Sequence, residues 1–346
     1  MTPRPTFELE IGHRKVRLGE RTLIMAALNV TPDSFSDGGL HLDPERALAH
    51  GLELVRQGAD WIDVGGESTR PGSRPVSAEE ELRRVLPVIR SLRRELRSTP
   101  ISIDTTKAEV AEKAAQAGAS ILNDVSGLRF DPRLADVARR YKTPLILMHL
   151  RGRPETMQTM PFVGDIWRSL NRGLACSLQR ALGAGLRRSQ LILDPGLGFG
   201  KSRFQNFEIL AHLRKLRRFG LPILVGTSRK SFVQAIAAGA GLHAAALQGS
   251  RRKGGPAAYW PMIENLKAQQ APTLQLGDAA AVVASILGGA HIVRVHDVAG
   301  VLPAVRIADA VLTASRAGWN DEAEPESCPS DSLEKAIPVS SSASEW

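Results

Sequence analysis

The sequence predicts an α/β protein of the TIM (β/α)8 barrel class. Eight short apolar runs have the composition of β-strands, and amphipathic or alanine-rich helical segments separate them. Strands that alternate with helices imply right-handed crossovers and a parallel sheet, and eight strands close such a barrel. An open, doubly wound sheet is the alternative.

The apolar runs set the predicted order of elements. The predicted strands are 22–28, 61–64, 101–104, 120–124, 144–149, 191–194, 222–226 and 291–296. The first predicted helix covers 43–59, where Asp43 and Pro44 suit the N-cap and N1 positions. Further predicted helices are 107–119, 131–141, 204–220 and 278–290.

Two parts of the chain do not fit eight plain repeats. Residues 239–277 form a long segment before the last helix and strand, and we expect an insertion that is partly helical around 257–269. Residues 319–346 are acidic and rich in serine, which predicts a disordered tail. A single domain, 1–318, then contains the barrel and its insertion.

Composition excludes several classes of protein. Hydrophobic residues make up 43% of the chain and charged residues 23%, as in globular proteins with a sizeable core. The net charge of +9 favours a solvated basic face or attraction of an anionic small substrate. Aromatic residues are only 5%, and no basic run is interleaved with them, so we expect no nucleic-acid partner. Two cysteines and no apolar stretch of membrane-spanning length lead us to expect a cytoplasmic protein without a membrane partner.

Polar side chains stand at or just past the C-terminal end of the predicted strands. In a TIM barrel that face carries the active site, so these side chains are candidates for binding and catalysis. They are Asn29, Asp63, Asp104, Asn123, His149, Asp194, Ser228, Arg294 and His296.

Two loops on this face are unusually rich in small polar residues. The first, "NVTPDSFSDGG" (29–39), exceeds what a plain connection needs. The second, "DVGGESTRPGSRP" (63–75), offers Thr69, Arg70 and Arg74 as donors suited to an anion. Together they could close over a phosphorylated substrate, although a solvated glycine and proline loop is the alternative for the second.

The segment "DPGLGFGKS" (194–202) superficially suggests a nucleotide loop, but its spacing fits neither a P-loop nor a dinucleotide fingerprint. We interpret Asp194 as a buried carboxylate that accepts paired hydrogen bonds from the amino and ring N–H groups of a ligand. Capping of a helix is the alternative role.

Two later motifs suit an anion. In "VGTSRKSF" (225–232), Ser228 and Lys230 lie where a strand passes into a helix, and a helix N-terminus favours a carboxylate or phosphate. Capping by Ser228 alone is the alternative, and Lys230 can also reach a ligand carbonyl or line a pocket with its stem. In "IVRVHD" (292–297), Arg294 and His296 project from one face of the last strand and suit an anion clamp.

The chain contains no H-E-x-x-H motif, no C-x-x-C pair and no nucleophile elbow. A tightly held transition metal or an acyl-enzyme is therefore not expected. Carboxamide, hydroxyl and phosphate oxygens suit Mg²⁺ instead.

Taken together, the motifs resemble those of the dihydropteroate synthase family, folate-pathway enzymes that sulfonamide drugs target. The matching stretches follow the family order over roughly residues 20–310, and they are "LNVTPDSFSDGG", "DVGGESTRPG", "ISIDTTKAEVA", "ILNDVSG", "LMHLRGRPETMQ", "ILDPGLGFGK", "LVGTSRKSF" and "IVRVHDV". The resemblance implies a TIM barrel that joins 4-aminobenzoate to 6-hydroxymethyl-7,8-dihydropterin diphosphate with Mg²⁺. It implies the products 7,8-dihydropteroate and diphosphate, and a homodimer that forms through the late helices.

The resemblance also implies a role for each candidate residue. The pterin would be held by Asp104, Asn123, Asp194 and Lys230. The diphosphate would be held by Asn29, Arg294 and His296, and Asn29 would also ligate Mg²⁺. The aminobenzoate pocket would be shaped by Thr69, Arg70, Pro71, Phe199 and Ser228. The residues implied in catalysis are Asp33, Asp104 and Lys230, with both carboxylates placed to stabilise a pterin-methyl cation.

The chain departs from the family pattern where the insertion ends. The family usually has Gly-Thr at the start of the eighth helix, and this chain has Gly277 and Asp278. Thr106 also stands where an aromatic residue is often found. Two rival functions are a pterin-binding methyltransferase that serves a corrinoid and a binding paralogue without activity.

Overall fold

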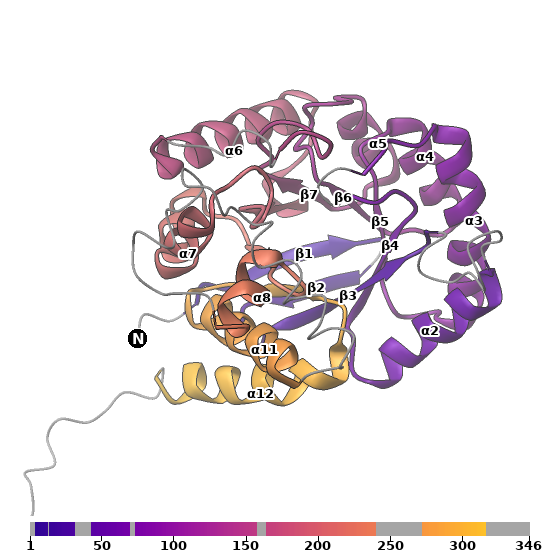
Figure 1. The fold of residues 1–346 in the computed structure, drawn as a ribbon. Coiled ribbons are helices and arrows are strands. Elements are labelled where there is room, and N and C mark those ends of the chain that lie inside the picture. Colours follow the sequence, from indigo (N-terminus) through magenta and orange to yellow (C-terminus); the bar gives the residue numbers. More distant parts are fainter. Residues whose placement is uncertain are drawn as a thin grey trace, which may run out of the picture.

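The computed structural model describes residues 4–12, 14–31, 43–69, 73–157, 164–239 and 272–315. Eight parallel strands form its central sheet, surrounded by helices, and their order is β8-β7-β6-β5-β4-β3-β10-β9 (Figure 1). A parallel bridge between Leu193 of β8 and Ile223, beside β9, joins the two ends of the sheet. The predicted TIM barrel is therefore confirmed.

The barrel strands lie within a residue or two of their predicted positions. They are β3 (Leu23–Asn29), β4 (Trp61–Gly65), β5 (Ile101–Asp104), β6 (Ile121–Asp124), β7 (Leu145–Met148), β8 (Leu191–Asp194), β9 (Leu224–Gly226) and β10 (Ile292–Val295). Their side chains are almost all buried, as expected for a parallel sheet that is covered on both faces.

Helices cover the outside of the barrel (Figure 1). They are α2 (Pro44–Arg56), α3 (Ala78–Glu95), α4 (Ala108–Ala117), α5 (Leu134–Tyr141), α6 (Ile166–Gly183), α7 (Arg203–Ala211), α8 (Ser231–Ala237), α11 (Pro272–Leu287) and α12 (Val298–Ala314). The prediction for Asp43 and Pro44 is confirmed, because the Asp43 side chain accepts from the backbone N–H groups of Glu45 and Arg46.

Two helices differ from the prediction. The segment 204–220 was expected to be one helix, but α7 ends at Ala211 and a 3-10 helix follows over Leu213–Phe219. The last part of the expected insertion is also helical, because α11 begins at Pro272 rather than at 278. The expected helix around 257–269 and the tail 319–346 lie outside the described residues.

An N-terminal hairpin that the sequence reading missed lies at the opposite end of the barrel from the strand ends that carry the polar residues. Strands β1 (Phe7–Ile11) and β2 (Arg14–Leu18) pair antiparallel. Leu9, Ile11 and Leu18 pack against the first residues of the barrel strands, among them Leu23 and Trp61. The hairpin therefore covers the N-terminal end of the barrel and leaves the C-terminal end for the functional site.

Candidate active site

Buried polar side chains from several strands meet at the C-terminal end of the barrel. Arg294 of β10 is at their centre: its Nε donates to Asp63 Oδ2 over 2.7 Å, and its Nη2 donates to Asp104 Oδ2 over 3.1 Å. Asn123 Nδ2 donates to the same Asp63 oxygen over 3.0 Å. One guanidinium and one carboxylate thus connect β4, β5, β6 and β10.

Burial and neighbouring charge shift the proton equilibria of this group. Burial, and then the neighbouring Asp63 carboxylate, raise the pKa of Asp104 to about 8, although Arg294 opposes this shift. Burial therefore favours the protonated form of Asp104 in the ligand-free site, while the Asp63 side chain accepts from the Arg294 guanidinium. Asp63 is fully buried, so its contact with Arg294 is shielded from water.

Asp194 and Lys230 belong to the same group of polar side chains at the C-terminal end of the barrel. Asp194 Oδ1 accepts from the backbone N–H of Gly196 over 2.7 Å, and burial raises the pKa of Asp194 to about 6. Burial, and then the Arg294 charge, lower the pKa of Lys230 to about 8. The Lys230 ammonium lies 4.0 Å from the centre of the Phe199 ring, within range of a cation–π contact. Each of these two groups therefore titrates near neutral pH.

Lys201 supports the loop that carries Asp194 and Phe199. Its buried Nζ donates to the backbone oxygens of His149, Gly196 and Phe199 over 3.0, 2.7 and 3.1 Å. These three bonds use all three ammonium hydrogens and connect the loop after β8 to the end of β7. Burial lowers the pKa of Lys201 to about 7, with Asp194 opposing.

The turn after β9 brings Ser228 close to His296. Ser228 Oγ lies 3.4 Å from both the backbone N and the Nδ1 of His296. Ser228 is buried, and Asp278 of α11 accepts a hydrogen bond from its hydroxyl over 3.0 Å. Ser228, which was predicted to contact the aminobenzoate, and His296, which was predicted to contact the diphosphate, are thus neighbours.

Asn29, at the end of β3, faces the same space as Asp104. A Cβ atom at Gly65 would lie 3.8 Å from Asn29 Oδ1 and 3.8 Å from Asp104 Oδ2. Because glycine has no Cβ, a small space stays open between a carboxamide oxygen and a carboxyl oxygen. Such oxygens, completed by substrate phosphate and water, are the ligands that Mg²⁺ prefers.

The second loop is fixed by buried charges. Lys107, at the start of α4, donates to Glu67 in the loop and to Glu81 of α3, the latter over 2.6 Å. Burial raises the pKa of Glu81, which Lys107 opposes. Thr69 lines a cavity of about 610 Å³ beside this cluster, together with Arg129 and other residues of the loops after β5, β6 and β7.

Three predicted residues cannot be placed. Asp33 of the first loop and Arg70 and Pro71 of the second loop lie outside the described residues. The sequence reading had placed Asp63 at a strand end but gave it no role, and it overlooked Lys201. Asn29, Asp104 and Asn123 stand at one level of the sheet, with Gly65 between them on β4, whereas Asp63 lies two residues lower, level with Ala27 and Ser102, so the pattern of strand ends did not single it out.

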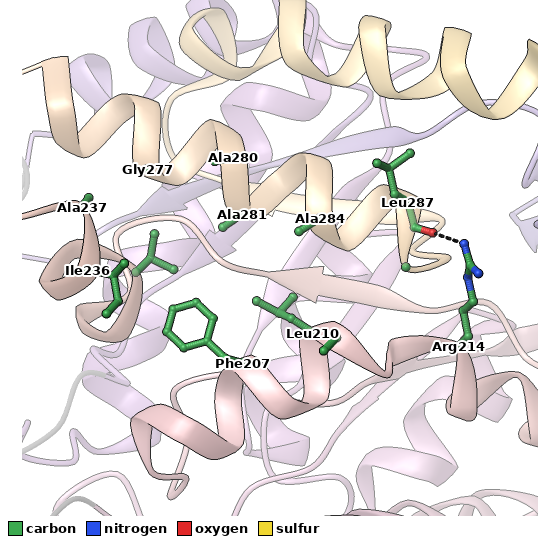
Figure 2. A pocket seen from close by; sticks show the side chains of 13 residues that line it. Phe207, Leu210, Arg214, Ile236, Ala237, Gly277, Ala280, Ala281, Ala284 and Leu287 are labelled. Carbon is green, nitrogen blue, oxygen red and sulfur yellow. Dashed lines mark hydrogen bonds between the residues drawn. The ribbon is translucent and has the colours of Figure 1, made fainter. Parts of the chain in front are cut away.

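A second cavity, of about 730 Å³, lies on the outer face between α7, α8 and α11 (Figure 2). Apolar side chains line it, among them Phe207 and Leu210 of α7 and Ala281 and Ala284 of α11. Arg214 donates to the backbone oxygen of Leu287 at one end, over 3.0 Å. This groove is separate from the polar site inside the barrel mouth.

None of the helices in the described part of the chain combines the length and apolarity needed to span a membrane. The described residues also contain no group of three or more His, Cys, Asp or Glu side chains that could hold a metal ion.

Comparison with known proteins agrees with this architecture. A family profile described as "Pterin binding enzyme" matches residues 25–296. The dihydropteroate synthase of Synechocystis sp. is 41% identical over 88% of this chain and 94% of its own length. That of Escherichia coli K12 is 40% identical over 84% of this chain and 92% of its own length.

Solved structures give the same result. A Yersinia pestis dihydropteroate synthase in a sulfonamide complex is 38% identical, with a TM-score of 0.73 over 89% of this chain and 100% of its own. A Xanthomonas albilineans dihydropteroate synthase with 4-aminobenzoic acid is 38% identical, with a TM-score of 0.71 over 89% of this chain and 98% of its own. A Xanthomonas albilineans dihydropteroate synthase in complex with 7,8-dihydropteroate is 36% identical, with a TM-score of 0.68 over 88% of this chain and 98% of its own. The chain belongs to the dihydropteroate synthase family of pterin-binding enzymes.

Proposed function

We propose that this protein is a transferase that condenses 6-hydroxymethyl-7,8-dihydropterin diphosphate with 4-aminobenzoate. The bond between the pterin methylene carbon and the diphosphate oxygen breaks, and a carbon–nitrogen bond to the aniline forms. The aniline nitrogen loses one proton, and the products are 7,8-dihydropteroate and diphosphate. The observation that carries this proposal is the set of buried Asp104 and Asp194 and half-buried Lys230 and Arg294 at the barrel mouth of a family member.

The pterin ring would lie between Asp194 and Lys230. A carboxylate accepts paired hydrogen bonds from the amino and ring N–H groups of a pterin, and an ammonium donates to its carbonyl oxygen. Asn123 and Asp104 complete the polar edge. Asp104, Asn123 and Asp194 are buried, so their hydrogen bonds would discriminate strongly against rings that lack the matching groups.

The diphosphate requires a cation and hydrogen-bond donors at the other end of the site; Arg294 would supply the charge, and His296 beside it would supply a ring N–H. Arg294 uses Nε and Nη2 for its two carboxylate partners, which leaves Nη1 to donate to phosphate oxygen. With Asn29, these residues would bind the leaving group and stabilise the charge it gains when the bond breaks.

We propose that Mg²⁺ assists this step. Asn29 Oδ1 would hold the ion together with diphosphate oxygens and water, beside the open space at Gly65. When bound, the ion neutralises phosphate charge as a Lewis acid.

The aminobenzoate would lie against Phe199 and Ser228, with Thr69, Arg70 and Pro71 of the second loop closing the pocket. No protein nucleophile is needed, since departure of diphosphate leaves a methylene cation that the pterin ring delocalises. Positive charge beside Asp104 favours loss of its proton, so this group becomes anionic as the cation forms. Asp33 on the first loop would add a second carboxylate, and closure of both loops would exclude water.

Replacing Arg294 separates the two ends of the substrate. Arg294→Ala should weaken binding of the pterin diphosphate about tenfold or more, and weaken binding of the pterin without diphosphate much less, because only the former presents an anion. Isothermal titration with each ligand measures this difference. Equal losses for both ligands would show that Arg294 does not bind the diphosphate.

We propose a homodimer that forms through the late helices. Leu276 of α11 is 68% exposed and Ile307 of α12 is 66% exposed. These helices pack against each other, and a dimer contact through them would cover these apolar side chains. Sedimentation velocity should give a dimer, and Ile307→Lys should shift it toward monomer. A monomeric wild type at all concentrations would contradict this proposal.

The rival functions make different predictions. A pterin-binding methyltransferase would transfer a methyl group from methyltetrahydrofolate to a corrinoid, without consuming aminobenzoate. A binding paralogue would bind the pterin and release no diphosphate. Mass spectrometry of the product formed from both substrates distinguishes the three cases, because only the synthase yields 7,8-dihydropteroate.

A further inference from the structure

The turn after β9 has an unusual backbone. Arg229 adopts a φ of 57°, the left-handed region that residues other than glycine seldom occupy. The turn is closed by a bond of 3.3 Å from Lys230 N to Thr227 O. Ser228 and Lys230, the two proposed substrate ligands of this segment, flank Arg229. Their directions therefore depend on whatever holds Arg229 in this conformation.

Asp278 of α11 holds Arg229 in this conformation. Its Oδ2 accepts from the backbone N–H of Arg229 over 2.8 Å and from the Ser228 hydroxyl over 3.0 Å. The Asp278 side chain is buried, and its Oδ1 has no hydrogen-bond partner among the described residues. A single carboxylate oxygen of α11 thus accepts hydrogen bonds from a side chain and from the backbone of the turn.

Close packing of two helices brings Asp278 to this position. Gly277 of α11 lies beside Ala237 of α8, and a Cβ at Gly277 would be 2.7 Å from the Ala237 Cβ (Figure 2). Real Cβ atoms do not approach so closely, so glycine is what permits this packing. Asp278 is the next residue, and the close approach of the helices lets its short side chain reach the turn.

The hydrogen bond to Asp278 also determines whether the Ser228 hydroxyl can donate to or accept from other groups. A hydroxyl has one hydrogen, and here that hydrogen is directed to Asp278. The oxygen remains an acceptor and faces the backbone N–H of His296 at 3.4 Å. Asp278 therefore fixes both the position of Ser228 and the direction of its hydroxyl.

We propose that Asp278 is a positioning residue for the aminobenzoate end of the site, acting through Ser228 and the Arg229 turn. The inference rests on the proposed function, because it uses the assignment of Ser228 to aminobenzoate. Both partners of Asp278 are neutral donors, so the requirement is for an acceptor oxygen at this place rather than for a negative charge. An asparagine side chain meets that requirement, and alanine does not.

Steady-state kinetics of Asp278→Ala and Asp278→Asn test the proposal. Loss of both bonds in Asp278→Ala should raise the KM for 4-aminobenzoate about tenfold, with a much smaller change in the KM for the pterin diphosphate. Asp278→Asn should stay within about threefold of wild type, because its amide oxygen still accepts both bonds. Gly277→Ala, which separates α11 from α8, should resemble Asp278→Ala.

Asp309→Ala is a matched control. Asp309 lies in α12 and also accepts hydrogen bonds from a backbone N–H and a hydroxyl, both of Thr22 at the far end of the barrel. Its replacement should lower the thermal unfolding temperature and leave the ratio of the two KM values unchanged. A merely structural role for Asp278 would give the same pattern as this control, and that outcome would overturn the proposal.

A second variant keeps the test decisive if Asp278→Ala does not fold. Ser228→Ala removes the hydroxyl through which Asp278 acts and leaves Asp278 in place. Ser228→Ala should raise the KM for aminobenzoate more than the KM for the pterin diphosphate, and equal or absent changes in the two KM values would overturn the proposal. A folded wild type that forms no dihydropteroate would overturn the proposed function, and this inference with it. If the wild type is active but Asp278→Ala raises the KM values for aminobenzoate and for the pterin diphosphate equally, only the inference is overturned.

Discussion

At the scale of single residues, the site combines carboxylates and cations whose pKa values burial has moved toward neutrality. Burial raises the pKa of Asp194 to about 6 and that of Asp104 to about 8, and lowers the pKa of Lys230 to about 8. Groups that titrate near neutral pH respond to small changes in nearby charge. A substrate that brings a phosphate anion and becomes a cation during reaction supplies such changes.

The pKa of Asp194 predicts how pterin affinity depends on pH. Its carboxylate form accepts hydrogen bonds from the pterin amino and ring N–H groups, and protonation removes one acceptor oxygen. Affinity should therefore fall as pH decreases through about 6 and be level just above it. Fluorescence titration of the pterin between pH 5 and 7.5 measures this, with Asp194→Asn as the control whose affinity should be low and flat. A wild-type affinity independent of pH would contradict the role of Asp194.

Which of these residues could be predicted depended on their position in the pattern. Asp104, Asn123, Asp194 and Arg294 end apolar strands, so the barrel topology alone places them together. The pairing of Arg294 with Asp63 could not be predicted, because it depends on side-chain directions across three strands. Asp278 was noticed only as a departure from the family pattern, since its partners are 49 and 50 residues away in sequence.

At the scale of elements, loops on the catalytic face are fixed by two lysines, buried Lys201 and half-buried Lys107. Lys201 binds three backbone oxygens of the loops after β7 and β8, and Lys107 binds Glu67 in the second loop and Glu81 in α3. The sequence did not predict this structural role of Lys201, because a lysine that follows a glycine-rich segment suggests a contact with a ligand rather than with the backbone. Here its three hydrogens all go to the chain itself.

Removing the Lys201 ammonium should loosen this loop. Lys201→Met leaves three buried carbonyl oxygens without their donor, which lowers the free energy of unfolding by about 1–3 kcal/mol. Pterin affinity should fall as well, because Asp194 and Phe199 belong to the same loop. Urea unfolding and pterin titration measure the two effects. Lys15→Met, at a lysine whose side chain is 67% exposed, is the control and should change neither. Unchanged pterin affinity in Lys201→Met would show that the loop does not need this cation.

At the scale of the whole molecule, the two ends of the barrel have separate tasks. The N-terminal end is closed by the β1–β2 hairpin and buries an apolar cluster, and the C-terminal end collects the polar groups. The hairpin was missed although "FELEI" alternates as a strand should. Eight strands already complete a barrel, so the repeat pattern predicts no further strand at the N-terminus.

The hairpin should contribute to stability without affecting the chemistry. Leu18 is fully buried in the cluster at the barrel bottom, and Leu18→Ala should lower the free energy of unfolding by about 2–5 kcal/mol. The KM values of the folded variant should match wild type, since the site lies at the other end. Lys15→Ala in the same hairpin should change stability by no more than about 0.5 kcal/mol. Altered KM values in Leu18→Ala would show that the two ends are coupled.

The central claim concerns the reaction, and one measurement tests it most directly: diphosphate release by the purified protein given the pterin diphosphate and Mg²⁺, with and without 4-aminobenzoate. The account predicts release that depends on aminobenzoate and equals the dihydropteroate formed, one molecule for each. A folded protein that binds the pterin diphosphate but releases no diphosphate with aminobenzoate present would contradict it.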